Sequence, residues 1–298
     1  MIAFSSPGAS AAQEGSGCTL VRTGAVTTAS LALGTPGLWD YGDAPDNTHV
    51  FPMTTWYSAP GAPIGQFPTL AGTANTIFPG QPGARHEVVD IGWLGNVSAY
   101  PGFGIFPLNA PADSPPSLEA DADLAPDADP TTNLVGATPD HDLYDDGLYA
   151  AAVGPGLGTL SFRVSSIPGI TNWYVNALID WNYDGSWSTP SPAAEWVVVN
   201  MPVTVPALTS SSFTSPAFPT GPSSYTPWVR LTLSDTPIVT PPGTNWDGST
   251  PPGTLDFLGQ KAFKCGETED YCGAITVQSS DPTRDMHVTC KQRQQTPP

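Results

Sequence analysis

The sequence predicts an all-β protein, and three observations favour this fold class. First, the 298 residues include 30 glycines and 35 prolines; proline lacks a backbone donor and glycine costs conformational entropy, so both disfavour long helices. Second, apolar–polar alternation and β-branched runs recur after residue 158, between turns rich in Pro, Gly and Ser. Third, no amphipathic pattern extends beyond about two helical turns. We predict a β-sandwich of the jelly-roll or immunoglobulin-like type, with long Pro/Gly-rich loops and strand-like terminal arms.

The chain divides into three predicted regions. Residues 1–38 are small and weakly patterned, and we expect an N-terminal arm, either exchanged between subunits or paired within its own chain. Residues 39–278 form the predicted sandwich, which includes an acidic loop at 113–147. Residues 279–298 add a C-terminal strand and a tail.

The predicted strands follow one another closely after residue 158. Two of them, 160–164 and 228–233, alternate apolar and polar side chains, which is typical of half-buried strands. Two others, 173–180 and 195–201, are continuous β-rich runs, which is typical of strands buried on both faces. The last two predicted strands are 274–278 and 286–290.

The charge balance excludes two classes of partner. Asp and Glu number 27 against 9 Lys and Arg, so the formal net charge is −18. Nucleic acids and anionic membrane surfaces are bound through cationic patches, so we expect neither as a partner. Membrane insertion is not expected either, because no stretch reaches the roughly 18 apolar residues that a spanning helix needs.

Four cysteines, Cys18, Cys265, Cys272 and Cys290, show no metal-binding spacing. With few lysines and many Pro, Thr and Ser, they indicate an oxidising, extracellular or cell-surface setting. We predict the pairs Cys265–Cys272 and Cys18–Cys290, the first closing a short loop and the second joining the two terminal regions. Four free buried thiols are the alternative.

The sharpest local motif begins at Asp180 and reads DWNYDGSW. Oxygen-bearing side chains at positions 1, 3 and 5, followed by Gly at position 6, match the first half of a calcium loop. It is not an EF-hand, because position 12 is Ser191 rather than Glu. The alternative is a hairpin whose Asp and Asn side chains cap their own backbone. The predicted loop ligands are Asp180, Asn182 and Asp184, and the candidates for a more distant carboxylate are Glu195, Glu267, Glu269 and Asp270.

Two further acidic clusters are candidate calcium sites. Carboxylates this close together repel one another unless a cation screens them or they remain in water. A solvated acidic loop and ordinary Asx turns are the respective alternatives. The first cluster is Asp140, Asp142, Asp145 and Asp146, and the second contains Asp40 and Asp43.

Catalytic motifs are weak, so we predict that the protein is not an enzyme. No GxSxG, P-loop or GxGxxG pattern occurs. The run from His86 resembles a zincin helix but carries Asp90 where the second histidine should be. A carboxylate pair could hydrolyse glycosides, but a sequence this acidic always offers such a pair. The nine tryptophans could form a sugar-stacking platform, or they could pack in the core.

Six motifs, taken in order, resemble the GEVED-domain family, named for a Gly-Glu-Val-Glu-Asp run near the end of the domain. That run here reads GETEDY at 266–271, with Thr in place of Val. The resemblance spans about residues 39–278. The other motifs are DYGDAPD at 40–46, GARH at 83–86, DDG at 145–147, the strand and turn at 179–187, and WVRLTLS at 228–234.

The resemblance implies a secreted β-sandwich module of prokaryotic surface proteins, with calcium ligation and no catalysis. This chain differs from the family in two ways. Family members are usually modules of much longer proteins, whereas this chain stands almost alone, and Cys265 and Cys272 bracket the signature run. The first difference favours a self-contained subunit over an adhesin module.

Together these features predict a non-catalytic, calcium-stabilised extracellular structural protein. We expect it to be a self-assembling subunit of a cell-surface filament or sheath, in which copies join by β-strand addition at open sheet edges. The alternative from another class is a carbohydrate-binding or adhesive module of a secreted protein, with glycans as partners. A secreted hydrolase with two facing carboxylates is a third possibility.

Overall fold

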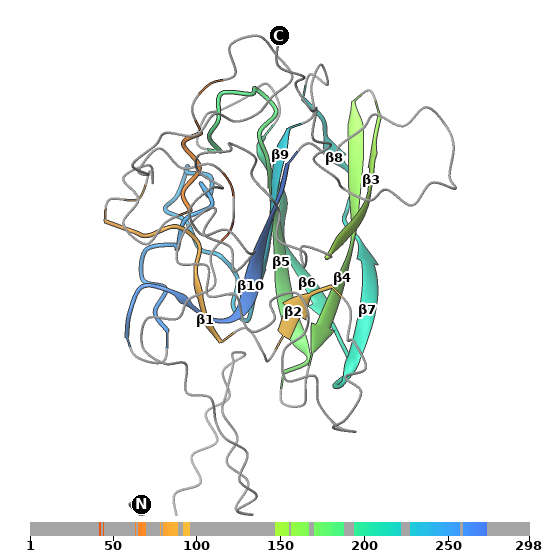
Figure 1. Cartoon of the computed structure of the whole chain (residues 1–298), viewed down its shortest axis with the longest axis vertical. Helices are drawn as coiled ribbons and strands as arrows, with labels where there is room; N and C mark the ends of the chain where they lie inside the picture. Colours follow the sequence, from red (N-terminus) through yellow and green to blue (C-terminus); the bar gives the residue numbers. More distant parts are fainter. Residues whose placement is uncertain are drawn as a thin grey trace, which may run out of the picture.

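The computed structural model describes an all-β protein. Its described residues form ten strands and no helix, and the strands are arranged in two sheets (Figure 1). No helix among them is long and apolar enough to cross a membrane. The described residues are 42, 44, 63, 65–69, 78, 80–88, 92–95, 147–154, 156–166, 170–187, 194–221, 227–256 and 259–272.

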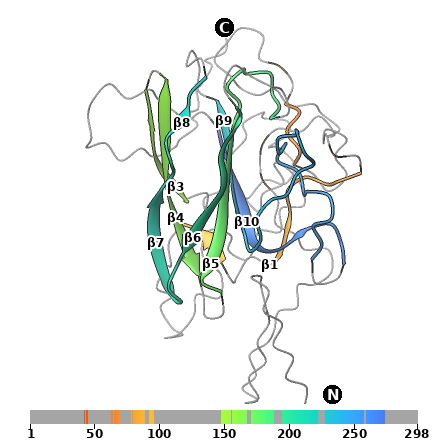
Figure 2. The same cartoon turned by 180° about the vertical axis from the view of Figure 1, so that it is seen from behind.

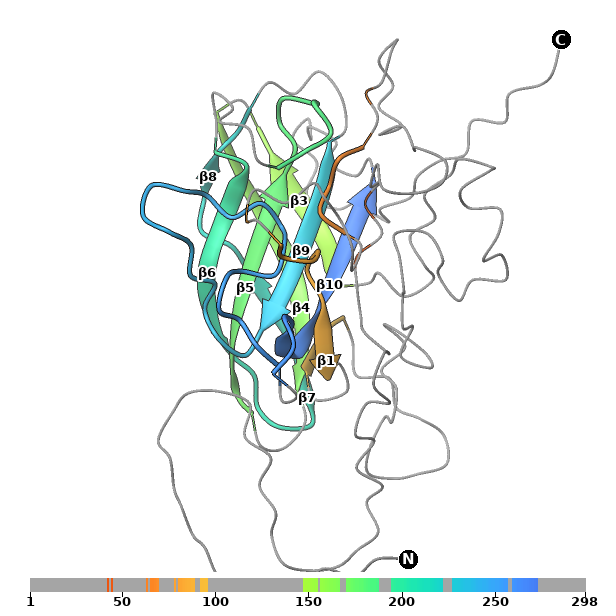
Figure 3. The same cartoon turned by 90° about the vertical axis from the view of Figure 1, so that its left-hand side faces the viewer.

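The first sheet has the strand order β1-β10-β9-β5-β6, and Figure 3 shows these strands side by side. Strand β1 pairs with β10 in parallel, and all other pairs are antiparallel. Arg230 on β9 lies between Asp270 on β10 and Leu178 on β5. The bounds are β1 His86–Val88, β5 Asn172–Ile179, β6 Trp196–Thr204, β9 Trp228–Ser234 and β10 Phe263–Cys272.

The second sheet is built around β4, and all its pairs are antiparallel. Val164 on β4 pairs with Leu94 on one side and with Ser211 on the other. Strands β2 and β3 therefore lie on one side of β4, and β7 and β8 lie on the other. The bounds are β2 Gly92–Leu94, β3 Leu148–Val153, β4 Leu157–Ser166, β7 Thr209–Thr214 and β8 Phe218–Pro219.

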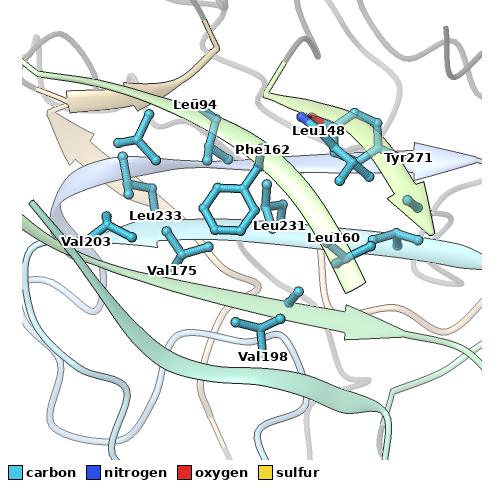
Figure 4. Close-up of a cluster of buried hydrophobic side chains, with 14 of the residues drawn as sticks. Leu94, Leu148, Leu160, Phe162, Val175, Val198, Val203, Leu231, Leu233 and Tyr271 are labelled. Atoms are coloured by element: carbon cyan, nitrogen blue, oxygen red, sulfur yellow. Dashed lines mark hydrogen bonds between the residues drawn. The ribbon is translucent and has the colours of Figure 1, made fainter. Parts of the chain in front are cut away.

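The main hydrophobic cluster lies between the two sheets. Alternate residues of β5, β9 and β4 are buried in it, as expected for strands with one face on a shared core (Figure 4). Side chains such as Val175, Leu231 and Phe162 come from different strands and meet there. This contact between the inner faces is what holds the two sheets together.

The outer face of the first sheet is also covered. A second hydrophobic cluster brings Leu178 and Trp228 of the sheet against Phe67, Trp187 and Trp246 from the loops. The blue loop segments between β9 and β10 lie on the side of this sheet that faces away from the second sheet (Figure 2). The central strands β5 and β9 are therefore buried on both faces, and the polar groups on their outer face are enclosed.

The predicted strands around 160–164, 173–180, 195–201 and 228–233 are confirmed, with small differences at their ends. Strand β10, which carries the whole 266–271 run, was not predicted as a strand. The predicted strands at 274–278 and 286–290, the arms at 1–38 and 279–298, and most of the acidic loop lie outside the described residues.

Candidate functional site

The loop that begins at Asp180 turns tightly at the end of β5. Tyr183 and Gly185 have positive φ angles of 61° and 84°, and the glycine adopts this conformation without a Cβ penalty. Asp180 is fully buried, and its Oδ2 accepts a hydrogen bond from the Gly185 N–H at 2.9 Å. The Asp180 carboxylate thereby holds the turn closed from inside the protein.

The next two polar side chains bond within the loop itself. Asp184 Oδ1 accepts from the backbone N–H and the hydroxyl of Ser186, both at 2.9 Å. Asn182 Nδ2 donates to Asp184 Oδ2, and the Asp184 N–H donates to Asn182 Oδ1, again at 2.9 Å. These are the self-capping contacts that the sequence left open as the alternative to calcium ligation.

Glu195 lies beside this loop, just before β6. Its carbonyl oxygen accepts the Ile179 N–H at 2.9 Å, which places it next to the end of β5. The residue is only 2% exposed, and neither carboxylate oxygen accepts a hydrogen bond. Burial raises the pKa of Glu195 to about 9, with further contributions from the charges of Asp180 and Asp184. The sequence named Glu195 as one of four possible distant carboxylates, and this is the one found beside the loop.

Asp270 and Glu267 are engaged elsewhere. Arg230 donates to both oxygens of Asp270, from Nε at 2.8 Å and from Nη2 at 2.6 Å. Asp270 Oδ2 also accepts the Ala44 N–H at 2.8 Å, and Glu267 Oε2 accepts the Leu94 N–H at 2.5 Å. Both carboxylates therefore hold parts of the fold together, and neither is available as a cation ligand beside the Asp180 loop.

Arg230 connects the sheet to its covering loops. Its Nη1 donates to the carbonyl oxygens of Pro68 at 2.6 Å and Gly248 at 2.9 Å, and its Nη2 donates to Thr69 Oγ1 at 3.0 Å. The guanidinium also lies 4.5 Å from the centre of the Trp187 ring, a cation–π contact.

Gly42 of the DYGDAPD motif packs against the same ion pair. A Cβ at this position would collide with the Asp270 carboxylate and approach Arg230. This close approach requires glycine at position 42. Packing against the ion pair therefore explains the glycine of the motif without any metal ion.

Glu269 and Tyr271 fix the start of β3. Glu269 Oε1 accepts the Gly147 N–H at 3.3 Å, and the Tyr271 hydroxyl donates to Glu269 Oε2. The same hydroxyl accepts the Leu148 N–H at 2.8 Å. The signature run at 266–271 therefore anchors segments from several distant parts of the sequence.

The other predicted acidic sites are not described. Asp40, Asp43, Asp140, Asp142, Asp145 and Asp146 lie outside the described residues. Within the residues that are described, no three side chains of the His, Cys, Asp and Glu types are placed to hold a metal ion together. Any cation site at the Asp180 loop must therefore use fewer carboxylates, together with amide, backbone or water oxygens.

The cysteine pairing needs correction. Cys265 is disulfide-bonded, and both Cys265 and Cys272 belong to β10. At about 3.3 Å per residue, seven residues of strand separate their Cα atoms by roughly 23 Å, whereas a disulfide requires less than about 7 Å. The predicted Cys265–Cys272 pair is not compatible with this strand. Cys18 and Cys290 lie outside the described residues.

His86 and the tryptophans serve the core. His86 is on a strand rather than a helix, bonds Thr268 Oγ1 through Nε2 at 3.0 Å, and stacks on Phe263. Burial lowers its pKa to about 3, with the Cys265 backbone acting in the opposite direction and the Arg230 charge adding to the decrease. Six tryptophans in the described residues are buried: Trp93, Trp173, Trp181, Trp187, Trp228 and Trp246.

The comparisons with known proteins found no relatives. No protein-family model matches the chain, and no curated protein and no solved structure matches it either. The resemblance to the GEVED domain therefore remains a prediction from the motifs.

Proposed function

We propose that this chain is a non-catalytic, calcium-stabilised extracellular structural protein that assembles with copies of itself into a cell-surface filament or sheath. Its fold would be a β-sandwich of the jelly-roll or immunoglobulin-like type, and the motifs resembling the GEVED domain support a secreted module. The observation that carries the assembly is strand β7, which pairs with β4 and with no other strand in the described residues.

Strand β7 offers a regular edge for strand addition. It pairs residue for residue with β4 over Thr209–Thr214 and lies at the margin of the molecule in Figures 1 and 2. An edge strand with free N–H and C=O groups is a template for pairing with another chain. Strand β6, an edge strand of the first sheet, is interrupted at Asn200, whose φ is 46° and whose side chain bonds both the N–H and the carbonyl of Ile238.

The hydrogen-bond alternation shows which β7 donors point away from β4. Ser215 N–H donates to Leu160 O at 2.8 Å, and in an antiparallel pair the bonded positions then recur every second residue. Ser211 is in the same phase and faces β4, whereas Ser212 is out of phase and its N–H points outward. Ser165 and Ser210 form a pair whose backbones are not hydrogen-bonded to each other. Side chains are closer at such pairs, and the two serine hydroxyls are hydrogen-bonded at 2.7 Å.

A structural role also fits the buried charge chemistry. The carboxylates of the signature run and Arg230 hold loops onto the sheets rather than facing a cleft. A framework pinned in this way suits a building unit, because its surface can vary without disturbing the core.

Two proline variants test the assembly. We expect the wild-type chain to form oligomers by light scattering after gel filtration, and Ser212→Pro to reduce them strongly without a large change in Tm, because only an outward donor is lost. Ser211→Pro is the matched control and should lower Tm, because it removes a bond to β4. A wild-type chain that stays monomeric with calcium present, or a Ser212→Pro chain that assembles normally, would contradict the proposal.

A further inference from the structure

The Glu195 carboxylate is the least compensated acidic group in the described part of the chain. It is buried and neither of its oxygens accepts a hydrogen bond. Burying an ionised carboxylate without a partner is expensive, so such groups are normally protonated, paired or bound to a metal. Without an ion, burial keeps Glu195 protonated at neutral pH; its neighbours indicate that a cation could take the place of the proton.

The charged groups of the described residues that raise the pKa of Glu195 are Asp180 and Asp184, and both are acidic. Arg230, the buried cation of this region, is already paired in bidentate fashion with Asp270. Carboxyl groups therefore come together at the end of β5 from two segments, the Asp180 loop and the residue that precedes β6.

We propose that Asp180 and Glu195 together bind one divalent cation of the calcium class, with the 180–185 loop supplying further oxygens. The inference rests on the proposed function and deepens it by locating the stabilising ion. A cation here would offset the mutual repulsion of the acidic groups and would link β5 to β6 through side chains as well as backbone.

The donor chemistry selects the ion. The groups that meet here present oxygen atoms, which suit Ca²⁺ and Mg²⁺ rather than Zn²⁺ or Cu²⁺. Calcium accepts amide, carbonyl and water oxygens beside carboxylates, whereas magnesium demands a stricter geometry. Because the proposed site has only two carboxylate ligands, we expect a dissociation constant on the order of 10⁻⁴ to 10⁻³ M, the range of extracellular modules.

The loop is already shaped for this role by contacts independent of the ion. Asp180 Oδ2 fixes the turn through Gly185, and Asp184 is oriented by Ser186 and Asn182. Trp181 and Trp187 at the two ends of the loop are buried, which keeps the surroundings of the site dry and strengthens charge interactions there.

Terbium luminescence and thermal unfolding of the full chain test the site. Tb³⁺ replaces Ca²⁺ and should emit on excitation of the neighbouring tryptophans, and added Ca²⁺ should displace it. Ca²⁺ should also raise Tm. Glu195→Gln should weaken Ca²⁺ binding at least 10-fold, while Glu87→Gln on β1, at the other margin of the first sheet, should leave it unchanged.

A comparison with and without Ca²⁺ distinguishes a ligand from a merely structural residue. Without Ca²⁺ at neutral pH, Glu195→Gln should unfold close to the wild-type temperature, because burial keeps the Glu195 carboxyl protonated and neutral below its pKa of about 9. With saturating Ca²⁺ the wild type should unfold at the higher temperature. The absence of any Tm shift or Tb³⁺ emission up to about 10 mM, well above the expected dissociation constant, would overturn the proposal. So would equal binding by Glu195→Gln. Ca²⁺ binding without oligomers would count against the proposed assembly alone, and oligomers without binding against this site alone.

Discussion

Arg230 is fully buried, so the acceptors around it must compensate its positive charge in place of water. Its donors reach two carboxylate oxygens, two carbonyl oxygens and one hydroxyl. Such a group is stable only while every partner stays in place, because an uncompensated buried charge is strongly destabilising. At the scale of single residues, this network is the part of the fold most sensitive to substitution.

We therefore expect Asp270→Asn to lower the free energy of unfolding by about 3–5 kcal/mol, measured by urea denaturation, because it leaves the Arg230 cation without its counter-charge. The double variant Arg230→Met/Asp270→Leu should be less destabilised than the sum of the two single variants, since it removes both charges together. Additive losses would show that the two side chains are not coupled.

His86 gives the stability a pH dependence whose sign follows from its pKa. The folded-state pKa is lowered from 6.5 to about 3, so below pH 6.5 the unfolded chain takes up a proton that the folded chain refuses. His86 should therefore contribute a fall in stability of about 1.4 kcal/mol per pH unit as the pH decreases through this window. Glu195, whose folded-state pKa is raised to about 9, contributes in the opposite direction over the same window. The unfolding free energy of His86→Gln relative to the wild type should therefore rise as the pH decreases from 6 to 5, and a constant difference would contradict a buried neutral histidine.

At the scale of elements, the strands that were predicted are those whose side chains alternate or form apolar runs. Strand β9 alternates because Val229, Leu231 and Leu233 enter the core between the sheets. Strand β10 was missed because charged residues stand on both of its faces: Glu267 and Glu269 on the face of the core residue Tyr271, and Asp270 on the other. Such a pattern usually indicates a solvated loop. Those charges are buried only because Arg230 and the N–H groups of distant loops neutralise them, and sequence spacing does not reveal such long-range partners.

The candidate site shows the same limit. The Asp180 loop was predicted from its spacing, since the residues that form a tight turn are neighbours in sequence. The choice among distant carboxylates was not predictable, because it depends on strand pairing: β6 runs antiparallel to β5, and the residue before β6 thereby lies beside the loop that follows β5. Glu267 and Asp270 lie on β10, where they bind the Leu94 N–H and Arg230 instead.

At the scale of the whole molecule, the two sheets share one core, and loops cover the outer face of the first sheet. The 266–271 run adds hydrogen bonds to residues far away in the sequence, such as Ala44 and Gly147. Cys265 is placed on the same strand, facing the main core. A covalent link there would tether another part of the chain to β10, the strand next to the edge strand β1 of the first sheet.

Because Cys272 cannot reach it along an extended strand, we expect Cys265 to be bonded to Cys18 or Cys290. Peptide mapping without reduction should recover a Cys265 peptide joined to one of these two, and reduction should lower the free energy of unfolding by about 2–4 kcal/mol, as is typical for a bond that closes a long loop. Replacing Cys265 by Ser should have the same effect as reduction and should abolish the linked peptide. A recovered Cys265–Cys272 peptide would instead mean that β10 is not a continuous strand in solution, and the burial of Glu267 and Asp270 that depends on it would fail as well.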